Sequence, residues 1–100
     1  MHKYLVEFLG TMFLMYVVLA TKSWSAIGLA LGLAVLIGGP TSGGVYNPAV
    51  ALAIYVAGIR NEKTNQLIID KNEFIPYIVF EGLGALAAWY AYSNYVIAPN

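Results

Sequence analysis

The stretch TSGGVYNPAVALA, residues 41–53, interrupts the most hydrophobic part of the chain. It holds a cluster of turn-forming residues, then Asn47-Pro48, and then an apolar segment that stops at Gly58. At about 1.5 Å per residue, a helix over residues 48–57 spans about 15 Å, which is half of a ~30 Å hydrocarbon core. The sequence therefore predicts a helix that begins within a membrane and cannot cross it.

The composition is that of a membrane protein with one domain at most. Of the 100 residues, 60% are hydrophobic and 10% are charged, and the mean hydropathy is +0.70. Soluble domains carry about 25% charged residues, so this chain has too little charge to cover a soluble surface. The net charge is zero and no basic cluster is present, which argues against a nucleic-acid partner.

Three apolar segments approach or reach the roughly 20 residues that a membrane-spanning helix needs. They cover about residues 4–21, 23–39 and 75–97. Between them we expect a re-entrant loop and half-helix over residues 40–58 and a polar loop over residues 59–74. The predicted fold is an all-α protein with three transmembrane helices and one re-entrant half-helix. We expect the whole protein to be integral to the lipid bilayer.

An N-terminal signal peptide is the alternative for residues 1–20. Glu7 lies inside the would-be apolar region and disfavours that interpretation. The class of protein is the same under either reading, because cleavage would leave a membrane protein.

The distribution of basic residues predicts an orientation. With three spans, the N-terminus and the 59–74 loop lie on one side of the membrane, and that side carries Lys3, Arg60, Lys63 and Lys71. The other side carries only Lys22. Since cytoplasmic loops are enriched in Lys and Arg, we expect the N-terminus and this loop to be cytoplasmic.

The residues around the break predict its geometry. Gly38 to Pro40 are expected to end the second helix, and Gly43-Gly44 permits a close backbone return. Asn47 is a favoured N-cap, and Pro48 suits the first helical position because its missing N–H has no helical partner there. Gly58 is expected to follow the end of this helix as a C-terminal glycine.

This arrangement suggests a pore. If the Asn47 side-chain oxygen caps its own helix, its NH2 group remains free to donate a hydrogen bond to a passing water or polyol. The carbonyls of Gly43, Gly44 and Val45 are expected to supply acceptors along the path. The competing interpretation is that Asn-Pro merely opens a helix, as it does in many soluble proteins.

Residues 42–50, SGGVYNPAV, resemble the SGGHFNPAV motif of the aquaporin (major intrinsic protein) family. Weaker matches are found at residues 6–11, 29–33 and 76–85, in the family's order. The resemblance covers nearly the whole chain. It implies half of an aquaporin-like fold, with Asn47, Pro48 and Ala49 as the pore motif.

The chain also departs from the family pattern. It matches only the first of two repeats, so the second motif and its filter arginine have no counterpart. Val45 replaces the usual histidine. The filter aromatic of the second span corresponds to Ile27 or Leu31, and neither is aromatic. Selectivity for water or for glycerol-type solutes therefore cannot be carried over.

The predicted spans contain two acidic residues, Glu7 and Glu81. Ionisable residues in a spanning helix are functional candidates. In the aquaporin-like interpretation Glu7 accepts hydrogen bonds from loop N–H groups, with Thr11 one turn further on the same face, and Glu81 acts in the same way. In a small proton-coupled exporter Glu7 would instead be the coupling site, but such exporters have four full spans.

The small residues predict helix packing. Gly28 and Gly32 in the second span, and Gly84 and Ala88 in the third, are four residues apart and allow another helix to approach closely. We find no nucleophile–base pair, phosphate loop or metal-ligand spacing, and the chain has no cysteine. We therefore expect no enzyme, no cofactor and no metal.

A half-helix that ends at the midplane needs a second one to complete a channel. The hypothesis is a channel for water and small neutral solutes, completed by an antiparallel second copy or by another half-repeat. The four-to-one distribution of basic residues argues against dual insertion. The alternatives are a non-conducting scaffold or accessory subunit, and the exporter that uses Glu7.

Overall fold

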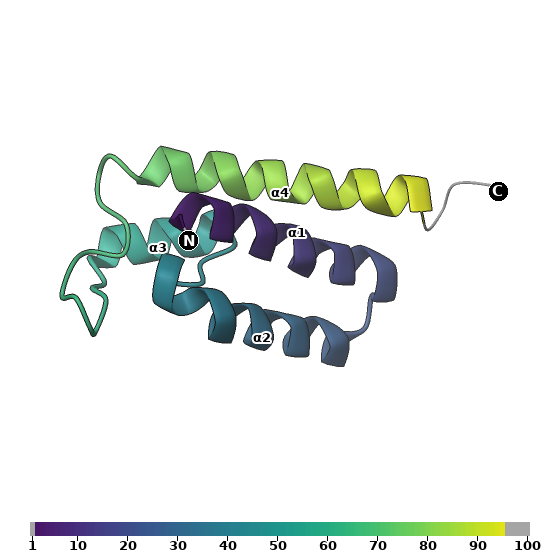
Figure 1. Cartoon of the computed structure of the whole chain (residues 1–100), viewed down its shortest axis with the longest axis horizontal. Coiled ribbons are helices and arrows are strands. Elements are labelled where there is room, and N and C mark those ends of the chain that lie inside the picture. Colours follow the sequence, from purple (N-terminus) through teal and green to yellow (C-terminus); the bar gives the residue numbers. More distant parts are fainter. Residues whose placement is uncertain (1, 96–100) are drawn as a thin grey trace.

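The computed structural model describes residues 2–95, which form four helices (Figure 1). Their bounds are α1 Lys3–Thr21, α2 Trp24–Ser42, α3 Pro48–Ala57 and α4 Phe74–Tyr95. Helices α1, α2 and α4 are long and apolar enough to cross a membrane, whereas α3 is too short. The predicted all-α class, with three spans and one half-length helix, is therefore confirmed. Residues 96 and 97 of the third predicted span lie outside the described residues.

The three long helices run side by side, and α3 lies at the end where α1 and α4 begin and α2 finishes (Figure 1). A short turn joins α1 to α2. It starts at Lys22, whose backbone is left-handed (φ 51°), and Ser23 caps α2 by accepting a hydrogen bond from the N–H of Ala26. Helix α1 packs on both α2 and α4, while α3 packs on α4.

Helix α2 continues beyond the predicted stop at residues 38–40. Pro40 lies inside the helix, which ends at Ser42 and is followed by Gly43 in a left-handed conformation. Proline removes one backbone donor, but a single lost bond in the last turn is tolerated when neighbouring groups compensate. The N–H of Gly43 donates to the Gly39 carbonyl and closes that turn. The prediction was wrong because the positive φ of Gly43, and not the proline, determines where the helix ends.

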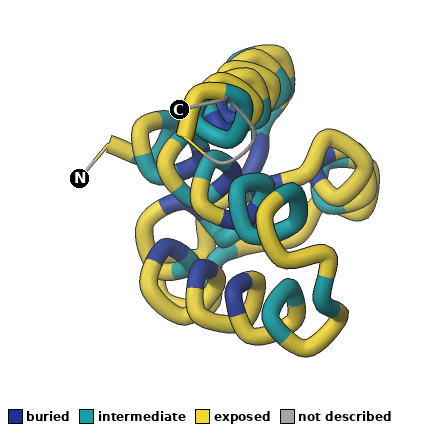
Figure 2. Tube along the Cα trace, turned by 90° about the vertical axis from the view of Figure 1, so that its right-hand side faces the viewer, coloured by how far each residue is buried: buried dark blue, intermediate teal, exposed yellow. Residues whose placement is uncertain are grey.

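The core consists of two clusters that meet at the return loop between α2 and α3. Tyr46 belongs to the cluster between α1 and α2, and Val45 belongs to the cluster that includes Ala51, Ile69 and Tyr77. The buried residues gather where the helices face one another, and the outer surfaces are exposed (Figure 2). These outer surfaces are apolar, as expected where a helix contacts lipid.

Of the two residue pairs predicted to pack against another helix, one does so in the structure and the other does not. Gly84 and Ala88 are buried, and a Cβ on Gly84 would lie 2.6 Å from the Phe8 carbonyl oxygen of α1. This pair therefore joins α4 to α1. Gly28 and Gly32 are exposed, and apart from their chain neighbours and the nearby backbone of α2 itself, no atom of the described residues lies within 4 Å of a Cβ built there. This second pair packs on no other helix of the described chain.

The polar loop between α3 and α4 has a defined structure. Arg60 pairs with Leu67 in an isolated antiparallel bridge, and the Ile68 N–H donates to the Ile59 carbonyl. Ile69 is buried with 1% of its surface exposed, so the loop packs against the helices. Lys3 forms an ion pair with Glu73, which joins the start of α1 to the start of α4.

Candidate pore-forming site

Helix α3 is delimited by the residues at its two ends. The Asn47 Oδ1 accepts a hydrogen bond from the N–H of Ala49 at 2.8 Å, and Pro48 occupies the first turn. At the other end Gly58 is left-handed (φ 66°), and its N–H bonds back to the last turn of the helix. Each end therefore satisfies backbone groups that a helix terminus otherwise leaves free.

Three residues with positive φ turn the chain from α2 into α3. Gly43 and Gly44 have φ values of 89° and 64°, which glycine adopts without steric cost. Tyr46 has φ 56°, which is uncommon for a residue with a large side chain. Such a conformation persists only where the surroundings hold it in place.

The buried carboxylate of Glu7 contacts this turn. It accepts hydrogen bonds from the backbone N–H of Tyr46 at 2.7 Å and of Val45 at 3.1 Å, and from the Ser42 hydroxyl at 2.7 Å. One turn further along α1, the Thr11 hydroxyl donates to the Tyr46 carbonyl at 3.3 Å. Helix α1 therefore contacts both the donor and the acceptor of the Tyr46 backbone.

The carbonyl oxygens of the turn differ in their partners. The Ser42 carbonyl accepts from the Tyr77 hydroxyl at 2.7 Å, and the Tyr46 carbonyl accepts from Thr11. The three carbonyls between them, those of Gly43, Gly44 and Val45, accept no hydrogen bond from residues 2–95. The loop therefore carries a run of free acceptors.

A donor follows these acceptors. Asn47 is exposed, and within the described part of the chain its side-chain NH2 group makes no hydrogen bond. Because the Oδ1 is held by the cap, the direction of the NH2 group is restricted as well. The site thus combines backbone acceptors, a fixed amide donor and the positive end of the α3 dipole.

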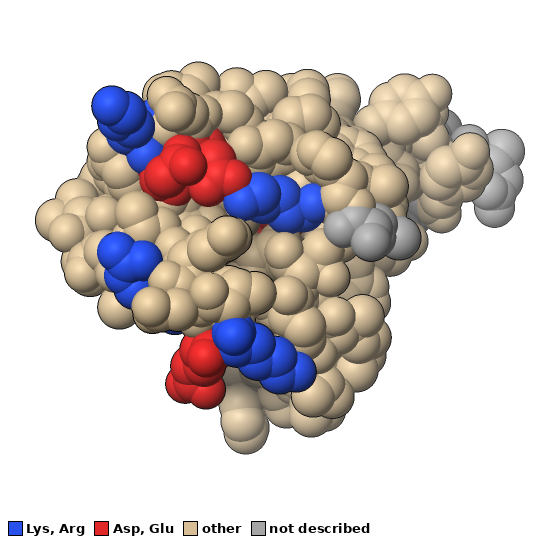
Figure 3. Space-filling model, turned by 60° about the vertical axis from the view of Figure 1, so that its left-hand side comes forward, with Lys and Arg blue, Asp and Glu red and all other residues tan. Residues whose placement is uncertain are grey.

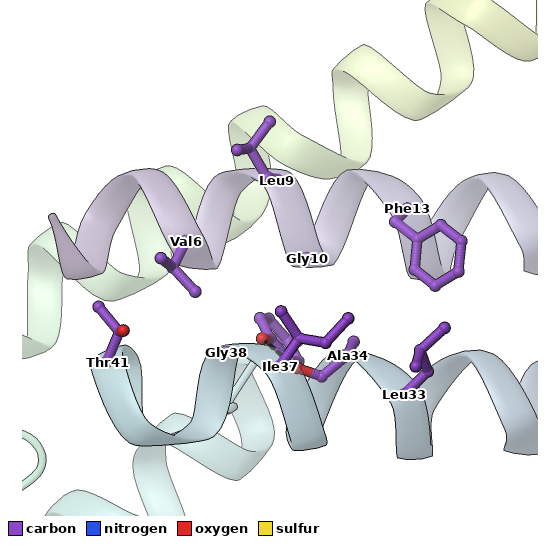
Figure 4. Close-up of a pocket in the computed structure, with 10 residues that line it drawn as sticks. Val6, Leu9, Gly10, Phe13, Leu33, Ala34, Ile37, Gly38 and Thr41 are labelled. Atoms are coloured by element: carbon purple, nitrogen blue, oxygen red, sulfur yellow. Dashed lines mark hydrogen bonds between the residues drawn. The ribbon is translucent and has the colours of Figure 1, made fainter. Parts of the chain in front are cut away.

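Tyr46 occupies a notch between α1 and α2 that the sequence analysis did not predict. A Cβ on Gly10 or on Gly38 would overlap the Tyr46 side chain, and the Tyr46 hydroxyl donates to the Ala34 carbonyl at 2.7 Å. The notch opens into an apolar groove of about 500 Å³. Figure 4 shows Val6 and Phe13 on α1 pointing toward α2, where Leu33 lies opposite Phe13.

Glu81 differs from its predicted role in anchoring the loop. Only 1% of its surface is exposed, yet neither carboxyl oxygen has a hydrogen-bond partner among the described residues. The N–H groups of Val45 and Tyr46 bond to Glu7 on α1 instead, so they are not available to α4. Glu81 lies beside Glu7 and the Asn47 backbone without bonding to the loop.

Sequence reasoning assigned no role to three further residues of the site, namely Ser42, Tyr46 and Tyr77. Ser42 bonds to Glu7, and the Tyr77 hydroxyl contacts the carbonyls of Ser42 and Ile68. One signal was present, because a tyrosine in an apolar run needs a partner for its hydroxyl. The matching glycines at 10 and 38 are too far apart in sequence to be paired without the fold.

The fold and the site together define an all-helical integral membrane protein with three spans and one half-length helix. The chain is 39% identical over 107 aligned residues to glycerol uptake facilitator protein-like 6 of Lactiplantibacillus plantarum. The alignment covers 98% of this chain and 45% of that protein, so the chain spans about half of its relative's length. That relative is a member of the aquaporin (major intrinsic protein) family.

The predicted resemblance is thereby confirmed: the chain resembles an aquaporin half-repeat over nearly its whole length, and its fold is half of an aquaporin-like fold. No model of a protein family matches the chain. No solved structure matches it either.

Proposed function

We propose that this chain is one half of a membrane channel for water and small neutral solutes, with Asn47, Pro48 and Ala49 at the centre of the pore. The observation that carries the proposal is the pattern of free polar groups. Three carbonyls that accept no hydrogen bond within residues 2–95, those of Gly43 to Val45, precede the fixed NH2 group of Asn47. Water and polyols both donate and accept hydrogen bonds, so a row of acceptors followed by a donor suits them.

The N-terminal end of α3 favours the exclusion of cations from the proposed pore. The N-terminus of a helix carries a partial positive charge, and here that charge lies beside the Asn47 donor. Half-helix ends of this kind create an electrostatic barrier to protons and cations. A neutral solute does not experience this repulsion.

The proposed pore needs a second half. Residues 47 to 50 at the start of α3 are exposed, and the outward-facing Val56 on the same helix is 75% exposed. An uncovered helix terminus within the hydrocarbon leaves polar backbone groups facing lipid, which is costly. We propose that a second copy of this chain, antiparallel to the first, or another half-repeat covers this end and supplies the opposing half-helix.

We also propose that the N-terminus and the loop after α3 are cytoplasmic. Lys3, Arg60, Lys63 and Lys71 belong to the end of the molecule that holds this loop, while Lys22 lies in the turn at the far end. Figure 3 shows basic and acidic side chains gathered on one face. Four basic residues against one favour a cytoplasmic position for the loop.

The structure gives little support to the exporter alternative. Glu7 has 0% of its surface exposed and accepts three hydrogen bonds from the loop, so it does not face an aqueous path. A coupling residue has to exchange protons with water. Dependence of transport on a proton gradient and on Glu7 would restore this alternative.

The site is tested by Asn47→Asp in proteoliposomes. Aspartate keeps the oxygen that caps α3, so the helix is retained. It lacks the NH2 donor and adds a negative charge, so the polar groups proposed to line the pore change. We expect slower osmotic water flux and measurable cation leakage. Asn72→Asp, in the exposed loop, is the matched control and should behave like the wild type. Unchanged water flux and unchanged ion exclusion in Asn47→Asp would count against this site.

The source of the second half is tested by topology. Because the chain has no cysteine, Lys63→Cys introduces a single site for an impermeant label. Labelling of about half of the protein in intact cells, and of the rest after opening, supports the antiparallel pair. Labelling only after opening means a single orientation, and another half-repeat must then complete the pore.

A further inference from the structure

The Glu7 carboxylate has one acceptor position left. A carboxylate offers about four lone-pair positions. In Glu7, Oε2 accepts from Ser42 and Val45, and Oε1 accepts from Tyr46. All three partners donate to Glu7, which is the pattern of an ionised carboxylate. The remaining position is on Oε1.

Glu81 is placed beside this carboxylate and is itself without a donor. It is buried, it neighbours Glu7 and the Asn47 backbone, and neither of its oxygens is bonded within residues 2–95. The other titratable group close to it is Tyr77, one turn earlier on α4. The basic side chain of Lys3 pairs with Glu73 at the starts of α1 and α4. Within residues 2–95, Glu81 forms no ion pair.

Two adjacent carboxylates in an apolar core cannot both be ionised at acceptable cost, because each charge disfavours the other and neither is solvated. A single proton shared by the pair removes the repulsion between the two charges and gives Glu81 a hydrogen-bond partner. A protonated Glu81 is neutral, and its O–H is a donor that can use the last acceptor position of Glu7.

We propose that Glu7 and Glu81 form a buried proton-binding site that holds one proton at neutral pH, with Glu7 as the carboxylate and Glu81 as the carboxylic acid. The Glu81 O–H donates to Glu7, whose other bonds hold the loop before α3. The bound proton therefore belongs to the structure that positions Asn47. Removing the proton leaves two adjacent negative charges beside the loop that carries Asn47.

Infrared spectroscopy of the purified protein in detergent tests the proposal directly. At neutral pH we expect the carbonyl stretch of one protonated side-chain carboxyl in the wild type. It should vanish in Glu81→Gln, in which the amide keeps the shape and a donor. Glu62→Gln, in the exposed loop, is the control and should retain the band. Absence of the band from the wild type overturns the proposal without the need for any variant, and so does a band that persists in Glu81→Gln.

Stability against pH gives a second readout. Glutamate side chains in the unfolded chain lose their protons near pH 4.3, about their ordinary value. If the folded state keeps a proton above that pH, it binds one more proton than the unfolded state, so stability falls as the pH rises. The folding constant should decrease about tenfold per pH unit while the site remains protonated.

The change can be followed by SDS titration monitored by tryptophan fluorescence, and Glu81→Gln should flatten this slope by one proton. An equal slope in Glu81→Gln and in the wild type would contradict the proposal. Neither readout requires transport, so failure of the proposed channel and failure of the proton site are distinguishable.

Discussion

Glu7 and Tyr46 lie 39 positions apart in the sequence, yet the Glu7 Oε1 accepts the backbone N–H of Tyr46 at 2.7 Å. This bond holds a bulky residue at φ 56°, immediately before the cap of α3. One carboxylate on α1 thus contacts the turn that sets the direction of the half-helix.

We expect Glu7→Gln to destabilise the fold by about 2–5 kcal/mol, since it removes a buried charged acceptor and leaves backbone donors unpaired. The measurement is the midpoint of SDS unfolding followed by tryptophan fluorescence. Glu62→Gln, which is exposed in the loop, serves as the matched control and should change the midpoint little. Equal midpoints for Glu7→Gln and the wild type would show that the loop keeps its conformation without this carboxylate.

Gly38→Ala should destabilise the protein by about 1–3 kcal/mol, because its methyl group overlaps the Tyr46 side chain and overpacks the notch. Gly32→Ala lies on the same helix with open space around it and should be neutral or slightly stabilising. In a double-mutant cycle, Tyr46→Phe should lower the cost of Gly38→Ala, since the tyrosine hydroxyl is the nearest atom to the new methyl group. Strictly additive effects would argue against this contact.

Gly84→Ala should weaken the packing of α4 against α1, because the new methyl group clashes with the α1 backbone. Its Cβ would lie 2.6 Å from the Phe8 carbonyl oxygen and 3.1 Å from the Met12 backbone nitrogen, and backbone atoms cannot move aside as a flexible side chain can. We expect a loss of about 1–3 kcal/mol in the same SDS titration. Gly82→Ala, two residues away with nothing within 4 Å, is the paired control. A similar loss in both variants would contradict the prediction, because Gly82 makes no such contact with α1.

Tyr77→Phe should loosen the loop between α3 and α4. The variant keeps the ring but removes the hydroxyl that bonds to the Ser42 carbonyl at 2.7 Å and approaches the Ile68 carbonyl at 3.4 Å. One lost buried hydrogen bond costs about 1–3 kcal/mol, and here the loss falls on the contact between this loop and the end of α2.

Limited proteolysis measures the effect of Tyr77→Phe through the rate of cleavage at Arg60, Lys63 or Lys71. We expect faster cleavage than in the wild type. Tyr90→Phe, whose parent side chain is 60% exposed, should leave the rate unchanged. An unchanged rate in Tyr77→Phe would show that other contacts hold the loop.

The sequence by itself determined the features that depend on local chemistry. The half-length of α3 follows from Asn47, Pro48 and Gly58, because caps act on groups within a few residues. The three spans follow from the length and hydropathy of their segments. These predictions needed no knowledge of what lies beside each helix.

Only the tertiary structure decided the features that depend on distant partners. Helix α2 passes Pro40 and ends at Ser42, before the left-handed Gly43. The loss of one backbone donor in the last turn is tolerated when neighbouring groups compensate. Glu7 and Glu81 have the same residue type and similar burial, but only Glu7 receives the loop donors. Their different environments arise from helix packing. Side-chain type predicts that a buried carboxyl needs a partner, and only the packed fold determines which carboxyl receives one.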